Sequence, residues 1–285
     1  MSTPFRLPTV AGRSVDGFLD FPEEPGRRPV IVVCHGFKGF MEWGFFPHLA
    51  ELLAERGFVV VRFNFSGSGM EPGRDRATDL EGFTANTFGH EQEDLQAVLD
   101  AVTGDGPEPL APERIDPERL GLFGHSRGGG TAILTAAAEP WNERLGALVT
   151  WAAVATFDRF PEEAKAQWRE EGTYPVVNSR TGQTLHLGLP LLQELEAAPE
   201  RFDIRRAARE RTVPWLIVHG TEDESVPVEE AHELAREAEK SDGVHELQPV
   251  AGASHTFGAQ HPFTHPTPHL ITAMNATQAW FKKHL

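Results

Sequence analysis

The strongest constraint on the fold is the alternation of short, nearly all-apolar runs with longer amphipathic ones. PVIVVCHG at 29–36 is followed by FPHLAELLAERG at 46–57 and then by FVVVRFNF at 58–65. Unbroken apolar runs of this length are typical of strands in a parallel sheet that helices cover on both faces. Because the segment between them has helical spacing, the three segments predict a βαβ unit.

The alternation continues to the end of the chain, and its 285 residues fit one large α/β domain. Segments around residues 5–21 predict one or two antiparallel edge strands. Further strands are expected at 119–124, 145–151, 213–220 and 244–250, and helices near 88–103, 127–138, 228–240 and 267–284.

Residues 152–211 interrupt this pattern with mixed helical fragments and no strand of matching length. A connection this long inside a compact domain usually has a function, often as a lid. Open α/β sheets bind ligands at the carboxyl ends of their strands. We therefore expect a cap at 152–211 above a core formed by 1–151 and 212–285, with a purely structural subdomain as the other interpretation.

Charge and composition limit the partners and the compartment. The formal net charge of −16 argues against nucleic acid or an anionic membrane as a partner, because either would need clustered Lys and Arg. The N-terminus lacks a basic segment followed by an apolar one, and the chain has no run of 18 apolar residues. With Cys34 as its single cysteine, the chain is expected in the cytoplasm.

The stretch GLFGHSRGGG at 121–130 contains a GxSxG pattern from Gly124 to Gly128. It lies where a predicted strand ends and a predicted helix begins, which is the context of a nucleophile elbow. An ordinary tight turn is the alternative. The surrounding glycines favour the elbow, because a strained serine backbone needs small neighbours, and Ser126 is the candidate nucleophile.

A serine nucleophile needs a base, and the base needs a group that orients it. His255 follows the run at 244–250 through VAGASHTF, on the loop before the last helix, although a surface loop histidine is also compatible. VHGTEDESVP at 218–227 offers Glu222, Asp223 and Glu224 as the orienting acid, and composition does not choose among them.

A metal site is the competing use of the histidines. His261, His265 and His269 are spaced by four, as on one face of a helix. Pro262, Pro266 and Pro268 disrupt a helix interior, and no Cys or Asp completes a ligand set. We therefore expect neither a metal nor an organic cofactor.

From residue 30 to the last helix, the chain resembles an α/β-hydrolase. The family pattern HGxxDxxVP matches His219, Gly220, Asp223, Val226 and Pro227, so the resemblance selects Asp223 as the acid. The order Ser, acid, His is that of the same fold.

The resemblance also accounts for CHGFKGF at 34–40. In the family an HG pair leads into the oxyanion loop, which implies the backbone N–H groups of Phe37 and Arg127 as donors; an ordinary glycine turn is the alternative. The loop with His35, Gly36 and Gly39 looks most like bacterial esterases of the feruloyl or cinnamoyl type. Dienelactone hydrolases are also similar, but they typically carry Cys as the nucleophile, and this chain has Ser126.

Substrate choice is assigned to the cap and the elbow. The candidate pocket residues are His125, Phe157, Phe160, Trp168 and Tyr174, although the cap aromatics equally fit a role in attaching the cap to the body. We expect cleavage of small or medium acyl or aryl esters through an acyl-enzyme.

Other functions fit the same residues. A peptidase related to the prolyl oligopeptidases is the nearest, although 285 residues leave no room for the propeller domain of those enzymes. A thioesterase, an acyltransferase and a non-catalytic ligand-binding protein are further alternatives. The sequence leaves the oligomeric state open, a homodimer included.

Overall fold

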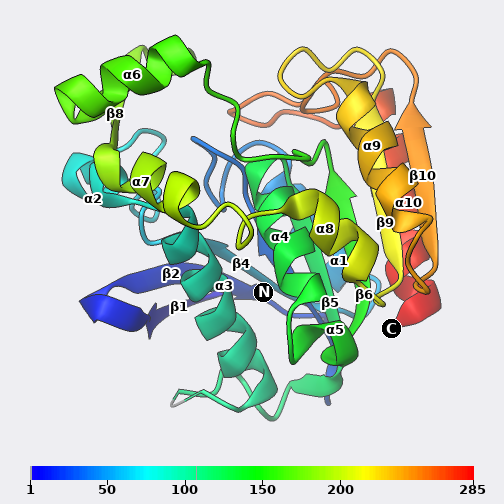
Figure 1. Cartoon of the computed structure of the whole chain (residues 1–285). Helices are drawn as coiled ribbons and strands as arrows, with labels where there is room; N and C mark the ends of the chain where they lie inside the picture. Colours follow the sequence, from blue (N-terminus) through cyan, green and yellow to red (C-terminus); the bar gives the residue numbers. More distant parts are fainter. Residues whose placement is uncertain (1, 107) are drawn as a thin grey trace.

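A computed structural model describes residues 2–106 and 108–285, and its centre is one large sheet (Figure 1). The sheet has 8 strands in the order β1-β2-β4-β3-β5-β6-β9-β10. β1 and β2 are antiparallel at one edge, and the strands from β4 to β10 are parallel. The strands are β1 (Ser2–Pro8), β2 (Ser14–Asp20), β3 (Arg28–Cys34), β4 (Val59–Asn64), β5 (Ile115–His125), β6 (Leu145–Trp151), β9 (Trp215–Gly220) and β10 (His245–Val250).

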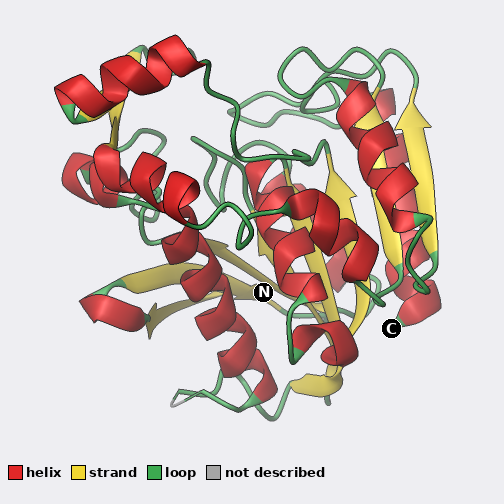
Figure 2. Ribbon diagram, viewed as in Figure 1, coloured by secondary structure: helices red, strands yellow, loops and turns green. Residues whose placement is uncertain are grey.

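Helices cover both faces of the sheet (Figure 2). α3, α4, α8 and α9 lie on one face, and α1 and α10 lie on the other. None of the helices in the described part of the chain combines the length and the apolar character needed to cross a membrane. The helices are α1 (Phe46–Ala54), α2 (Leu80–Ala85), α3 (Phe88–Thr103), α4 (Arg127–Ala137), α5 (Trp141–Arg144), α6 (Glu162–Glu171), α7 (Leu189–Ala197), α8 (Ile204–Glu210), α9 (Val228–Ala238) and α10 (Pro268–His284).

Strand β3 shows why the predicted strands are apolar throughout. Val30 and Val32 point into the core under α3 and α4, whereas Ile31 and Val33 point into the core under α1 and α10. Side chains alternate between the two faces of a strand, so a strand covered on both faces is apolar at every position. This confirms the predicted α/β-hydrolase fold class, with a mostly parallel sheet between two helical layers.

Residues 152–211 contain a hairpin that the sequence pattern did not predict. β7 (Thr173–Asn178) and β8 (Gln183–Gly188) form a separate 2-stranded antiparallel sheet between α6 and α7. The expectation of no clear strand here was wrong because these strands are exposed at several positions and carry polar residues. The hairpin, α6 and α7 lie on the side toward which β9 and β10 point (Figure 1). α8 packs instead against α4 and α9, in the helical layer of the core.

A buried ion pair joins the antiparallel edge to the parallel part of the sheet. Arg62 Nε on β4 donates to Asp20 Oδ2 on β2 at 2.7 Å, and Arg62 Nη1 donates to the carbonyl of Met41 at 3.1 Å. Both charged side chains are buried. The pair therefore fixes β2 and the segment after β3 to the same strand.

Replacing Arg62 is expected to destabilise the fold strongly. In Arg62→Met the Asp20 carboxylate stays buried without its cation, which typically costs about 3–5 kcal/mol. Urea denaturation of the variant measures the loss of unfolding free energy. Arg6→Met is the control, because Arg6 is exposed and lies 3.8 Å from Asp16, and exposed pairs contribute at most about 1 kcal/mol. Equal, small losses in the two variants would contradict the importance of the buried pair.

Candidate active site

Ser126 forms a sharp bend between strand β5 and helix α4. Its φ of 57° and ψ of −121° lie in a region that non-glycine residues rarely adopt. The bend needs small neighbours: a Cβ on Gly128 would lie 2.3 Å from the carbonyl oxygen of His35, and one on Gly124 would lie 2.5 Å from the carbonyl oxygen of Gly128. Gly124 and Gly128 are thus required by backbone contacts, as the elbow interpretation predicts.

The loop after β3 lies directly against this bend. A Cβ on Gly36 would lie 2.9 Å from Ser126 Cβ, so only glycine lets the loop come this close. The His35 ring holds the loop, because Nδ1 donates to the carbonyl of Gly36 at 2.9 Å and Nε2 accepts from the N–H of Phe65 at 3.2 Å. Burial lowers the pKa of His35 to about 4, so the ring is neutral.

Phe37 and Arg127, whose backbone N–H groups are the predicted oxyanion donors, line the same cavity as Ser126. Within residues 2–106 and 108–285, neither N–H has a hydrogen-bond partner. Free N–H donors beside a serine can stabilise the negative charge that develops on a substrate oxygen. The Arg127 side chain has protein partners, since its Nη1 lies 3.1 Å from Oε1 of the buried Glu91 and its guanidinium lies over the Phe37 ring.

Asp223 and His255 are brought together across 32 residues of sequence. His255 Nδ1 donates to Asp223 Oδ2 at 2.8 Å, while Asp223 Oδ1 accepts from the N–H groups of Ser225 and Val226 at 2.8 and 2.9 Å. Asp223 is buried, whereas Glu222 and Glu224 are exposed. Only Asp223 of the three candidate acids is hydrogen-bonded to His255 in the described structure.

A second histidine, His219, supports the same carboxylate. Its fully buried ring donates from Nε2 to the carbonyl of Val226 at 2.8 Å, and Nε2 lies 3.3 Å from Asp223 Oδ2. Burial alone would raise the pKa of Asp223, but the hydrogen bonds from His219 and His255 lower it well below its usual value. Sequence reasoning noted His219 only as part of the HGxxDxxVP pattern and gave it no role.

His125 holds the backbone of the loop that carries His255. Its Nε2 donates to the carbonyl of His255 at 3.1 Å, and the two rings lie 4.8 Å apart. Burial and the neighbouring charge of His255 lower the pKa of His125 to about 3. His125 is therefore neutral, and its main contacts are with the loop and with the Phe45 ring.

Ser126, His255, Phe37 and Arg127 line one cavity of about 430 Å³. Among the predicted pocket residues, His125, Phe157 and Phe160 also line it. No hydrogen bond joins Ser126 to His255 in the described residues, although both face the same space. The cavity thus contains the predicted nucleophile and the predicted base.

Trp168 and Tyr174 do not line this cavity. Trp168 is fully buried; its ring stacks on Tyr174 with centroids 5.5 Å apart and meets Phe160 edge-on at 5.2 Å. These aromatics form the internal core of the segment around α6 and β7. This cluster is continuous with the apolar core under α3 and α4, so the two rings also help to attach the segment to the body.

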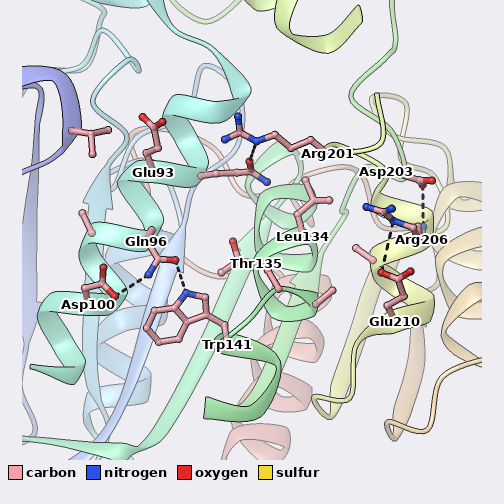
Figure 3. Close-up of a pocket in the computed structure, with 16 residues that line it drawn as sticks. Glu93, Gln96, Asp100, Leu134, Thr135, Trp141, Arg201, Asp203, Arg206 and Glu210 are labelled. Atoms are coloured by element: carbon pink, nitrogen blue, oxygen red, sulfur yellow. Dashed lines mark hydrogen bonds and ion pairs between the residues drawn. The ribbon is translucent and has the colours of Figure 1, made fainter. Parts of the chain in front are cut away.

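Another cavity, of about 600 Å³, lies between α3, α4 and α8 (Figure 3). It shares no lining residue with the first. Its polar groups are paired with one another: Gln96 accepts from Trp141 Nε1 and donates to Asp100, and Arg206 lies beside Glu210 (Figure 3). Although it is larger, its described lining residues include no nucleophile with an adjacent base, so the cavity at Ser126 is the candidate active site.

The histidines spaced by four do not share a helix. α10 begins at Pro268, so His261 and His265 lie in the loop before it. His261 Nδ1 accepts a hydrogen bond from the N–H of Gly44 at 3.0 Å. The structure explains His261 as a loop contact.

The sequence profile of the prolyl oligopeptidase family matches residues 43–285, which include the bend, Asp223 and His255. The chain belongs to this family. The resemblance to the α/β-hydrolase superfamily is therefore confirmed.

Individual relatives include both peptidases and esterases by name. An uncharacterized peptidase, YuxL, of Bacillus subtilis is 27% identical over 97% of this chain and 38% of its own length. The 2,6-dihydropseudooxynicotine hydrolase of Paenarthrobacter nicotinovorans is 26% identical over 75% of this chain and 50% of its own length. The chain thus spans half or less of these curated relatives. Est1E of Butyrivibrio proteoclasticus, solved with ferulic acid bound, has the same fold, with a TM-score of 0.75, 20% identity and 98% of each chain covered.

The buried neutral histidines make the stability of this family member depend on pH. The pKa of His125 is about 3 in the folded chain, and that of an unfolded histidine is about 6.5. Between these values the unfolded state binds a proton that the folded state does not. The unfolding free energy therefore falls with falling pH, by about 1.4 kcal/mol per pH unit for this group.

In His125→Gln, the loss of unfolding free energy from about pH 7 to about pH 4.5 is expected to be roughly 2 kcal/mol smaller than in the wild type. Urea denaturation at both pH values measures it. His232→Gln is the control, because His232 is exposed on α9. An unchanged pH dependence in His125→Gln would show that His125 is already charged in the folded chain.

Proposed function

We propose that the protein hydrolyses carboxylic esters of small or medium size through a Ser126-His255-Asp223 triad and an acyl-enzyme. The observation that carries the proposal is one cavity lined by Ser126, on a strained bend, and by His255, whose Nδ1 is bonded to Asp223. A serine exposed on such a bend beside a histidine held by a carboxylate is the arrangement that acyl transfer needs.

Each residue then has one role. Since Nδ1 of His255 donates to Asp223, Nε2 is the free nitrogen and takes the proton of Ser126 as the hydroxyl attacks the ester carbonyl. The protonated His255 gives that proton to the leaving alcohol. Water then attacks the acyl-enzyme with His255 again as base, and the acid product leaves. The lowered pKa of Asp223 keeps it ionised, so that it stabilises the imidazolium throughout.

The N–H groups of Phe37 and Arg127 are the proposed oxyanion hole. Both belong to the main chain, and both are free of other hydrogen bonds in the described residues. Loss of one such donor typically costs on the order of 10²–10³ in rate. The separation of Ser126 from His255 agrees with this mechanism, because catalytic hydrogen bonds are often long before substrate binds.

We propose that the part of 152–211 above the strands acts as a cap over the bound ester. Phe157 and Phe160 contribute apolar surface to the cavity, and the Phe157 ring stacks on Phe88 of the core with centroids 4.3 Å apart. The segment is also attached through Gln183, which bonds the N–H and the carbonyl of Ala77. These contacts favour a cap that is fixed to the body and shapes the acyl pocket.

Peptide hydrolysis is the second candidate, and the family match favours it. An amide and an ester are cleaved by the same triad, and a curated relative carries the name peptidase. The two functions differ in the leaving group, which is an amine from a peptide and an alcohol from an ester. Substrate panels separate them.

Replacing the nucleophile tests both candidates. Ser126→Ala is expected to reduce the turnover of p-nitrophenyl esters by a factor of about 10³ or more, because no covalent intermediate can form. An acyl-chain series of p-nitrophenyl esters, run beside aminoacyl p-nitroanilides, measures it. Cleavage of anilides at a higher kcat/KM than esters would favour the peptidase function. Ester cleavage that survives in Ser126→Ala would exclude Ser126 as the nucleophile.

The acid is tested by charge-neutral substitutions at adjacent positions. Asp223→Asn is expected to lower kcat by about 10³–10⁴, because the amide favours the wrong tautomer of His255. Glu222→Gln and Glu224→Gln are matched controls on the same loop, and they should stay within about twofold of wild type because both side chains are exposed. Equal effects in the three variants would contradict the role of Asp223.

A further inference from the structure

The cavity at Ser126 has a charge opposite to that of the whole protein. The chain carries a formal net charge of −16, yet the described carboxylate residues contribute no side chain to the cavity wall. Its fully ionised side chains are all basic: Lys38, Arg127, Arg159 and Arg180. A cleft lined by one sign of charge attracts ligands of the other sign.

Carboxylates outside the cavity wall neutralise two of these cations. Arg127 lies 3.1 Å from the buried Glu91, which also accepts from Asn86. Arg159 is paired with Glu230 and donates to the carbonyl of Ser225 at 3.0 Å. Both guanidinium groups therefore have protein partners that balance their charge.

Lys38 and Arg180 have no such partner in the described residues. Lys38 Nζ donates to the carbonyl of Val177 at 2.9 Å and forms no ion pair. Arg180 Nη2 is buried without a hydrogen-bond partner, and the guanidinium lies 5.4 Å from the centre of the Phe40 ring. The charge of Asp75 acts on Arg180, but the two form no ion pair. Burial lowers the pKa of both basic groups, which reflects their lost hydration.

The two cations are connected through the cap hairpin. Lys38 follows the proposed oxyanion donor Phe37 and is bonded to β7, and Arg180 lies in the turn between β7 and β8. Asn178 at the end of β7 and Ser179 in the turn also line the cavity. The hairpin and the loop after β3 thus bring two uncompensated positive charges to the space that contains Ser126.

Resting on the proposed function, we propose that the substrate is an ester with a free carboxylate, which Lys38 and Arg180 bind beside the scissile bond. A guanidinium fork and an ammonium group both make charge-assisted hydrogen bonds to a carboxylate, and these are stronger in a partly buried site. Lys38 Nζ and the donors of Arg180 other than the buried Nη2 would then bind the substrate oxygens. Phe157 and Phe160 remain available for the apolar part of the same molecule.

The preference is measured with matched ester pairs. p-Nitrophenyl hydrogen adipate is compared with p-nitrophenyl methyl adipate, which has the same leaving group and no charge. p-Butyryloxybenzoate is compared with p-butyryloxybenzamide, so that the carboxylate is on the alcohol side. In at least one pair, kcat/KM is expected to be about tenfold or more higher for the anion, and the ratio should fall as salt is added. A ratio near one in both pairs would overturn the proposal.

Variants locate the charge that produces the preference. Arg180→Gln and Lys38→Gln should each lower the anion-to-neutral ratio of kcat/KM several-fold, and Lys38→Arg should retain most of it. Arg76→Gln is the matched control, since it removes the same charge from an exposed position outside the cavity wall. An equal effect of Arg76→Gln would attribute the preference to net charge and overturn the assignment to Arg180 and Lys38.

A binding measurement separates this proposal from the proposed function. Calorimetry with adipate monomethyl ester and Ser126→Ala protein requires no turnover. Binding that Arg180→Gln weakens about tenfold would support the anion site even if the wild type cleaved none of the esters. Absence of binding to Ser126→Ala, in a protein whose wild type cleaves neutral esters, would overturn the anion site and leave the esterase function intact.

Discussion

The close backbone contact around Ser126 is the constraint on which the rest of the site depends. Strand β5 must pass into helix α4 through a residue with positive φ, and the helix must begin against the carbonyl oxygens at the end of β3. Gly128 allows the second contact and Gly36 allows the loop after β3 to reach Ser126. A side chain at either position would push these segments apart, so the glycines fix the relation between the proposed nucleophile and the proposed oxyanion donors.

Four histidines near that bend make different contacts. His35 and His125 are buried and neutral, and each uses its ring to hold a loop by main-chain hydrogen bonds. His219 supports the Asp223 carboxylate, which leaves His255 as the partly exposed histidine bonded to an acid. Motif reasoning found His255 from its place before the last helix. The supporting roles of the other three depend on hydrogen bonds between segments distant in sequence, and these have no local pattern.

Burial decides which strands could be predicted from the sequence. Strands β3 and β4 could be predicted because burial on both faces makes every residue apolar. β7 and β8 could not, because strands exposed at several positions carry polar residues and gain their order from contacts with Ala77 and Lys38. Likewise, the sequence pattern identified Trp168 and Tyr174 as aromatic cap residues, but only packing shows that they fill the interior of that segment.

The β7–β8 hairpin, which the sequence pattern did not predict, also contributes the side chains that would select a substrate. A triad and an oxyanion hole serve any acyl transfer, so they do not select a substrate. Selection must come from side chains that bind one class of substrate better than another. The hairpin contributes Arg180 and the carbonyl of Val177, which orients Lys38. In a strongly acidic protein, two partly buried cations without carboxylate partners are unfavourable in the free state, because part of their hydration is lost without compensation. An anionic substrate would compensate the two positive charges as it binds. The charges that destabilise the empty site would therefore stabilise the site with substrate bound.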